Sequence, residues 1–274
     1  MMKKTALFSL LVPAALLVGC HERSAVNGLT VEMLDCPLGV AAEHPRLSWR
    51  IESALPATVQ TGYRILVSTD PGDLETGENL IWDSGDVPSD RSVLVPYEGP
   101  ELESRRDYYW KVRVATNHGD TLWSEPSRWS MALLDDSDWQ ARWIGYDSCL
   151  NRTDTLGVFS RLAARYLRKE FDAGRDIAQA RLYISGLGLY ECYLNGCRVG
   201  EDVLAPTATD YTKTVCYNVY DVTDLLDEGV NTIGVILGNG RFFSMRTVTY
   251  TIPFTQVTIP GVRNYGYPKL LAQL

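Results

Sequence analysis

The chain has 274 residues, of which 45% are hydrophobic and 22% are charged, and its formal net charge is −8. This composition is typical of globular domains and excludes a fibrous or largely disordered chain. The acidic excess repels polyphosphates and anionic lipid, so it argues against nucleic-acid binding and against electrostatic docking on a membrane. The length predicts two ordinary domains.

The first twenty residues have the layout of an export signal. Two lysines near the start are followed by the apolar run 6–18 and by small residues before Cys20. The run is shorter than the roughly 20 residues that a membrane span needs. Leu-Val-Gly-Cys, ending at Cys20, resembles a bacterial lipobox, which implies lipidation of that cysteine. We expect residues 1–20 to be a lipoprotein signal peptide and the mature chain to be an exported cell-envelope lipoprotein, periplasmic or on the outer membrane; the alternative is an ordinary signal peptide with an incidental cysteine.

Residues 26–135 show short alternating runs broken by Pro, Gly, Asp and Asn, which predicts a β-sandwich without a helical stripe. The expected strands are 46–51, 62–68, 80–83, 91–95, 108–116 and 128–131. In the run 108–116 the large apolar residues alternate with polar ones, so we expect Tyr108, Trp110, Val112 and Val114 to face the core. This run and the turn after it resemble the F strand, turn and G strand of a fibronectin type III domain.

All seven tryptophans lie at or before Trp143, and the polar stretch 135–138 is the expected hinge. We expect a second all-β module over 138–274, with strands at 167–171, 180–186, 190–194, 215–221, 231–237 and 248–252. A helical turn begins with Thr223 as its cap and turns Leu225 and Leu226 inward. The final residues start a fresh strand and stop without a turn, so we expect this module to be incomplete at its C-terminus.

Asn195-Gly196, between two alternating runs, is the strongest short-range indication of a hairpin with a type I′ turn. The turn would place Cys192 and Cys197 as diagonal neighbours about 7–8 Å apart, too far for a disulfide. We expect both to be buried, small apolar side chains rather than zinc ligands. Once Cys20 is set aside, an odd number of the six cysteines remains, so at least one is unpaired.

Three phrases in order, Leu194-Asn195-Gly196, Asp221-Val222-Thr223 and Leu237-Gly238-Asn239-Gly240, resemble the galactose-binding-like jelly roll near the N-terminus of bacterial α-L-rhamnosidases of glycoside hydrolase family 78. The earlier stretches LTVEMLDCPLGVAAEHPRLSWRI and YYWKVRV resemble the immunoglobulin-like domain that comes first in the same enzymes. The resemblance covers nearly all of 29–274. It implies an all-β chain in which an immunoglobulin/fibronectin III-like sandwich is followed by a jelly roll.

The family hydrolyses terminal α-L-rhamnosyl linkages by inversion, with its acid and base on an α/α toroid downstream of these modules. This chain has no such helical region, so we assign no catalytic residue and expect the catalytic domain to be a missing C-terminal part. Some rhamnosidase jelly rolls hold rhamnose through calcium, which implies a bound Ca²⁺ with Asp202 and Asp210 as ligands.

The candidate carbohydrate contacts are Asn195, Asn239, Arg241 and Phe242. The family commonly has Trp after Gly-Asn-Gly, whereas Arg241, Phe242 and Phe243 follow here. Turn geometry alone also favours Asn and Asp at loop tips, and Arg241 has the alternative of a solvated or paired arginine.

Three functions stay open. The leading one is the N-terminal accessory, carbohydrate-binding part of an exported α-L-rhamnosidase that acts on rhamnose-containing glycans. The second is a free-standing, non-catalytic, sugar-binding surface lipoprotein. The third is a structural spacer.

Overall fold

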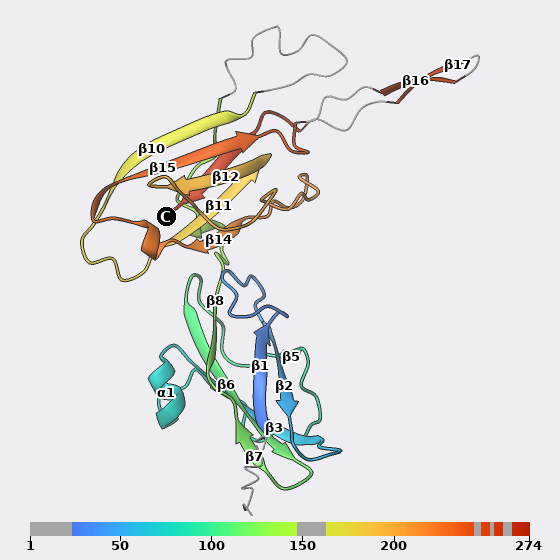
Figure 1. Cartoon of the computed structure of the whole chain (residues 1–274), viewed down its shortest axis with the longest axis vertical. Coiled ribbons are helices and arrows are strands. Elements are labelled where there is room, and N and C mark those ends of the chain that lie inside the picture. The colour runs from blue at the N-terminus through green and yellow to red at the C-terminus, as the bar shows by residue number, and fades with distance from the viewer. Residues whose placement is uncertain (1–23, 147–162, 244–247, 253–254, 260–264) are drawn as a thin grey trace, which may run out of the picture.

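The computed structural model describes residues 24–146, 163–243, 248–252, 255–259 and 265–274. The predicted signal peptide, with Cys20, lies outside these residues. Most described elements are β-strands, and they form two sandwiches that lie end to end along the longest axis of the molecule (Figure 1). The all-β prediction is confirmed. Among the described residues, every helix is too short or too polar to cross a membrane.

The first sandwich pairs a small sheet with a larger one, and all its ladders are antiparallel. The small sheet has the order β1 (Ala25–Val31), β2 (Arg46–Glu52) and β5 (Val95–Pro96). The larger one has the order β4 (Trp82–Asp83), β3 (Gln60–Ser68), β6 (Asp107–Thr116) and β7 (Thr121–Trp123), and β8 (Ser127–Ser130) also pairs with β6.

Strand β6 organises the core of this sandwich. Its alternation holds, because Tyr108, Trp110, Val112 and Val114 are all buried. Trp129 of β8 stacks on Tyr108 with ring centroids 5.3 Å apart. The central strand therefore carries the large apolar side chains that hold the two sheets together.

A short helix, α1 (Pro71–Thr76), was not anticipated from the sequence. Asp70 caps it by accepting a hydrogen bond of 2.8 Å from the backbone N–H of Gly72. Pro71 stands at the start, and Gly77 ends the helix with a φ of 74°. Six residues are too few to show an apolar stripe, and Leu74 is the one buried side chain within the helix.

The second sandwich has two four-stranded sheets. One has the order β10 (Arg165–Ala173), β15 (Gly229–Gly238), β12 (Leu189–Leu194) and β13 (Cys197–Arg198). The other has the order β14 (Asn218–Asp221), β11 (Arg181–Leu187), β18 (Lys269–Gln273) and β9 (Ile144–Gly145). A separate hairpin joins β16 (Val248–Ile252) and β17 (Thr255–Ile259).

The hairpin turn at Asn195-Gly196 has the predicted geometry, with φ values of 51° and 85°. A buried side chain fastens it to the rest of the domain. Asn231 accepts from the amide of Asn195 at 2.7 Å and from the backbone N–H of Asp227 at 2.8 Å, and it donates to the carbonyls of Asp227 and Gly229. All its hydrogen-bonding groups are thus used inside the fold.

The helical turn is the 3₁₀ helix η3 (Thr223–Leu225), and Thr223 lies inside it rather than capping it. Its hydroxyl donates to Asp221 at 2.6 Å and accepts from the backbone N–H of Ala180 at 2.9 Å. The cap prediction was wrong because the hydroxyl is engaged by Asp221 at the end of β14 and by the N–H of Ala180, just before β11. Leu225 and Leu226 pack against the core, as predicted.

The sandwiches touch through a nearly buried ion pair. The Arg181 side chain on β11, which is 8% exposed, pairs with the Asp107 carboxylate on β6 and donates to the carbonyl of Arg105 at 3.0 Å. Nearby, a Cβ added to Gly39 would stand 2.5 Å from Cγ2 of Val219. Backbone from one domain therefore packs directly on a side chain of the other.

Replacing Asp107 by alanine should lower the free energy of unfolding by about 3 kcal/mol, because it leaves the Arg181 guanidinium buried without its counter-charge. Urea titration followed by circular dichroism measures this. The matched control is Asp86→Ala, which removes an exposed partner of Arg113; the Asp86 side chain is 74% exposed, and such pairs contribute at most about 1 kcal/mol. Equal losses in the two variants would contradict a stabilising role for the domain contact.

Candidate functional site

Asn195, predicted as a carbohydrate contact, is engaged on both ends of its side-chain amide. Its nitrogen donates to the carbonyl of Leu225 at 3.0 Å and to Asn231, and its oxygen accepts from the backbone N–H of Thr232 at 2.9 Å. These bonds place the hairpin against β15. The residue therefore has a structural task that accounts for its presence without a ligand.

Asp202, a predicted calcium ligand, belongs to a row of polar side chains on the second sandwich. It accepts from the Tyr220 hydroxyl at 2.8 Å; that hydroxyl lies 3.4 Å from the hydroxyl of Tyr190, which donates to Asn218 at 2.9 Å. Burial raises the pKa of Tyr220 to about 12 and raises the pKa of Tyr190 further. Both phenols therefore stay protonated at neutral pH.

Asp210, the other predicted ligand, forms a local turn. One carboxylate oxygen accepts from the backbone N–H of Thr212 at 3.1 Å and from its hydroxyl at 2.6 Å, and Lys213 lies 3.8 Å from the other oxygen. Within the described part of the chain, no three His, Cys, Asp or Glu side chains gather where they could hold a metal ion. Calcium binding stays a prediction.

The loop after β15 brings distant aromatic residues together. Phe242 stacks on Tyr265 with centroids 5.9 Å apart, and Tyr211 meets both rings edge-on, at 5.2 Å from Phe242 and 5.4 Å from Tyr265. We call these three residues the loop aromatic cluster. Phe242 is only 7% exposed, so it offers little ring surface to a sugar and serves mainly as the centre of the cluster.

Arg241 is exposed and lies beside this cluster. Burial raises the pKa of Tyr211, and the positive charge of Arg241 acts in the opposite direction. An exposed guanidinium next to partly exposed tyrosine rings is a combination that binds sugar hydroxyls and apolar sugar faces. Sugar binding by Arg241 stays a prediction.

Close packing of glycines fixes the position of this loop. Gly188 has a φ of 134°, and a Cβ there would collide with the carbonyl oxygen of Gly238. A Cβ on Gly240, whose φ is 51°, would lie 3.0 Å from the carbonyl carbon of Gly188. Asn239 lies between Gly238 and Gly240 in the sequence, and its backbone carbonyl accepts a hydrogen bond from the N–H of Phe243 at 3.2 Å. The Gly-Asn-Gly sequence thus lets two backbones approach and holds Arg241 at the loop surface.

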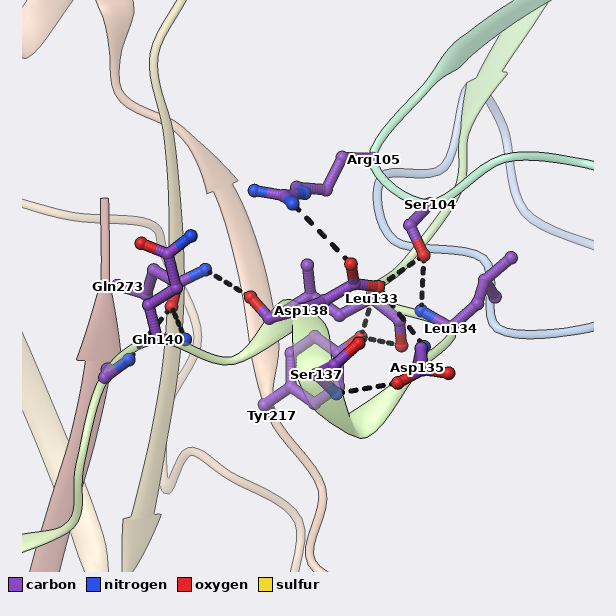
Figure 2. A network of polar contacts seen from close by, with 11 residues as sticks. Ser104, Arg105, Leu133, Leu134, Asp135, Ser137, Asp138, Gln140, Tyr217 and Gln273 are labelled. Atoms are coloured by element: carbon purple, nitrogen blue, oxygen red, sulfur yellow. Dashed lines mark hydrogen bonds and ion pairs between the residues drawn. The ribbon is translucent and has the colours of Figure 1, made fainter.

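A second polar centre lies in the linker between the sandwiches, where Asp138 ends the 3₁₀ helix η1 (Asp136–Asp138) (Figure 2). Its carboxylate accepts from Ser104 Oγ at 2.5 Å and from the backbone N–H of Asp135 at 3.2 Å, and Arg105 lies 3.6 Å away. Its backbone carbonyl accepts from the Gln273 amide at 3.0 Å. One residue is thereby bonded to both domains.

Further contacts close this junction (Figure 2). The side-chain oxygen of Gln273 accepts from the backbone N–H groups of Gln140 at 2.7 Å and Ala141 at 3.1 Å. The Tyr217 hydroxyl accepts from the N–H of Leu133 at 2.9 Å, and its ring meets Trp139 edge-on at 5.2 Å. Beside these groups lies a cleft of about 480 Å³, which we call the junction cleft; its walls include Leu134, Asp135, Asp136, Trp139, Trp143 and Tyr217.

Several described carboxyl groups have a pKa below the ordinary value. Hydrogen bonding by Ser104 and by the N–H of Asp135 lowers the pKa of Asp138, and hydrogen bonding by Ser137 lowers that of Asp135. Every described carboxyl with a displaced pKa is shifted downward. A general acid needs a raised pKa, so these five carboxyls are not suited to that role.

The cysteines beside the hairpin are both free thiols. Leu194 pairs with Cys197 across the turn, as expected, so Cys192 and Cys197 stand diagonally. The expectation that both are buried was wrong for Cys197, which is exposed because β13 is a two-residue strand at the sheet edge. Burial raises the pKa of the Cys192 thiol to about 12.

Sequence reasoning did not single out Tyr211, Tyr265 or the junction cleft. Each tyrosine lies in an irregular loop, where no strand or helix period indicates its neighbours. Two aromatic residues of the junction were visible in the sequence, since Trp139 and Trp143 closely follow the predicted hinge.

Comparison with known proteins assigns both sandwiches. The family described as "Rha78A-like, N-terminal immunoglobulin domain" matches residues 26–135, and the family described as "Alpha-L-rhamnosidase N-terminal domain" matches residues 175–269. The chain carries two domain types that these models describe as N-terminal, the second of them in α-L-rhamnosidases. The resemblance predicted from the sequence is confirmed, and it places these two modules with glycoside hydrolase family 78.

Relatives of known name agree. The chain is 35% identical over 259 residues to an alpha-L-rhamnosidase of Formosa agariphila, covering 86% of this chain and 27% of that protein. The solved alpha-L-rhamnosidase of Dictyoglumus thermophilum superposes with a TM-score of 0.78 at 33% identity, over 92% of this chain and 27% of that one. The alpha-L-rhamnosidase of Aspergillus terreus gives 0.72 at 31% identity, over 91% and 27%. The chain spans about a quarter of the length of these α-L-rhamnosidases.

Alkylation should separate the two hairpin thiols. At pH 8 the native chain should react with iodoacetamide at Cys197 and not at Cys192, because the Cys192 thiol is buried and its pKa is about 12. Peptide mass spectrometry measures the modification at each position. In urea both positions should react equally, which serves as the control, and rapid native labelling of Cys192 would contradict the buried position.

Proposed function

We propose that this chain is the N-terminal accessory and carbohydrate-binding part of an exported α-L-rhamnosidase, which hydrolyses terminal α-L-rhamnosyl linkages of rhamnose-containing glycans. The observation that carries the proposal is the order of two domain types, both described as N-terminal in rhamnosidases, over residues 26–135 and 175–269. The relatives' greater length supports an accessory role, since there is room in those enzymes for a separate catalytic domain.

In this proposal hydrolysis takes place on a further, C-terminal domain of the same protein. An inverting mechanism needs a carboxylic acid to protonate the leaving oxygen and a carboxylate about 6.5–9.5 Å away to activate water. The lowered pKa values of Asp135 and Asp138 make these two carboxyls unsuited to be the acid of this pair. The two sandwiches would hold substrate and support the catalytic domain.

The saccharide contact we propose is the loop beside the loop aromatic cluster. Arg241 would donate hydrogen bonds to sugar hydroxyls, and the partly exposed ring of Tyr211 would cover an apolar sugar face. The glycine packing at Gly188 and Gly240 keeps the loop in place before ligand arrives, which lowers the entropy cost of binding. Asp202 and Asp210 remain the proposed calcium ligands, because carboxylate oxygens suit that ion.

We further propose export and lipid anchoring through Cys20, on the basis of the sequence pattern. Labelling of the producing cells with a palmitate analogue, followed by mass spectrometry of the N-terminal peptide, tests it. A Cys20→Ala variant should lose the label and leave the membrane fraction.

The free-standing sugar-binding lipoprotein is the second candidate, favoured by two sandwiches that each have a hydrophobic core of their own. The two candidates differ in the gene. A reading frame that continues past the codon of Leu274 into helical repeats supports the enzyme, and a stop codon there supports the free-standing binder.

Isothermal titration of the chain with L-rhamnose tests the binding function in both candidates. Arg241→Ala should weaken binding by about tenfold or more, the effect of losing a charged hydrogen bond. Arg175→Ala, which changes another exposed arginine of the same domain, is the matched control and should leave binding unchanged. Titrations with calcium and with chelator measure the contribution of the ion.

A parent chain that releases no heat with L-rhamnose in either buffer would favour the structural spacer over both binding functions. Equal weakening by the two arginine variants would remove Arg241 from the site.

A further inference from the structure

The junction cleft has an aromatic wall that is open to solvent. Trp143 is 39% exposed and Leu134 is 37% exposed, although both are large apolar side chains. Trp139 and Tyr217 line the same cleft and are partly buried. Most large aromatic side chains of the first sandwich lie in its core, so exposed indole surface in a cleft is a departure that indicates a ligand or partner.

The carboxylates of Asp135 and Asp136 line the same cleft. Asp136 is exposed, and within the described residues its side chain makes no hydrogen bond or ion pair. Asp135 uses one oxygen to accept from the N–H of Ser137 at 2.7 Å. These oxygens can accept hydrogen bonds from hydroxyl groups. The negative charge that they bring opposes an anionic ligand.

The frame of the cleft is fixed from several directions. Asp138 ties the linker to the first sandwich through Ser104, and Gln273 ties it to the end of β18 (Figure 2). Tyr217 holds the backbone of Leu133 from the second sandwich. The lining groups are therefore already in position without a ligand, which reduces the cost of ordering them on binding.

We propose that the junction cleft is a second saccharide-binding site, for a neutral pyranose unit. The exposed face of Trp143 packs against the apolar face of the sugar ring, and Asp136, with the remaining oxygen of Asp135, accepts hydrogen bonds from ring hydroxyls. The cleft volume of about 480 Å³ lies in the range of small-molecule sites. The site is separate from Arg241 and does not depend on a calcium ion.

This inference goes beyond the proposed function, because the junction cleft is lined by the linker and the second sandwich and shares no residue with the loop aromatic cluster. Its ligand class follows from an open indole face beside hydroxyl acceptors. A cationic ligand would also suit indole and carboxylate, so the experiment includes one.

The test is intrinsic tryptophan fluorescence of the chain, titrated with methyl α-L-rhamnoside, methyl β-D-galactoside, sodium D-galacturonate and lysine methyl ester. We expect saturable binding of at least one neutral glycoside, with no response to galacturonate. Trp143→Ala should weaken that binding at least about fivefold through loss of the aromatic contact, and Asp136→Asn should weaken it by a smaller factor.

The matched control is Trp123→Ala. Trp123 on β7 is 42% exposed, close to the exposure of Trp143, but Lys111 covers its ring at 4.8 Å and it lies away from the cleft. Its replacement should leave glycoside affinity unchanged. Circular dichroism and melting temperature verify that each variant is folded, and Trp143→Phe should restore part of the affinity that alanine removes.

The inference is overturned if no neutral glycoside binds, if lysine methyl ester binds in their place, or if Trp143→Ala and Trp123→Ala behave alike. Failure here is distinguishable from failure of the proposed function. Binding that is lost in Arg241→Ala and kept in Trp143→Ala rejects the junction site alone, and the reverse pattern rejects Arg241 alone.

Discussion

The attachment of Asp138 to both domains is the constraint on which the arrangement of the molecule depends. Its carboxylate holds the first sandwich through Ser104, while its carbonyl receives the amide of Gln273 at the end of β18. Since a single residue carries both contacts, neither domain can rotate without breaking a hydrogen bond at the linker. The Arg181–Asp107 pair adds a second fastening about a different point of the interface. Two domains joined in this way move as one rigid unit rather than independently of each other.

A fixed support has a particular value in a glycosidase. In the proposed enzyme, accessory domains that hold the glycan in a constant orientation would help to bring it to the acid and base groups of the catalytic domain. The glycine contacts beneath the Arg241 loop serve the same end on a smaller scale, because they position an exposed guanidinium without using side-chain bonds. Rigidity is thus built at both levels, between domains and within a loop.

The sequence was sufficient for those features that depend on near neighbours in the chain. Alternation along β6 identified its buried side chains, and Asn195-Gly196 identified the hairpin and its turn type. The order of short motifs indicated the family. Helix α1 was not predicted because six residues are too few to show a helical pattern of apolar residues. Its start at Asp70-Pro71 and its end at Gly77 can be recognised in the sequence once the structure is known.

Features made by residues far apart in the chain could not be predicted. The sequence suggested an exposed aromatic platform at Phe242, but Tyr211 and Tyr265 pack against that ring in the structure. It also suggested a helix cap at Thr223, but the hydroxyl of Thr223 accepts from the N–H of Ala180 instead. Cys197 reads as buried until the strand order puts β13 at an edge. In each case the deciding neighbour belongs to another loop or strand, and one sequence contains no record of that proximity.

The pairing of β9 with β18 sets an order of events during synthesis. The first sandwich has all its strands once Ser130 has left the ribosome, so it can fold while the rest is still being made. The linker strand, by contrast, must wait for Leu270, which pairs with Ile144. Nascent chains therefore pass through a stage in which a finished first domain is followed by a strand whose partner has not yet been made.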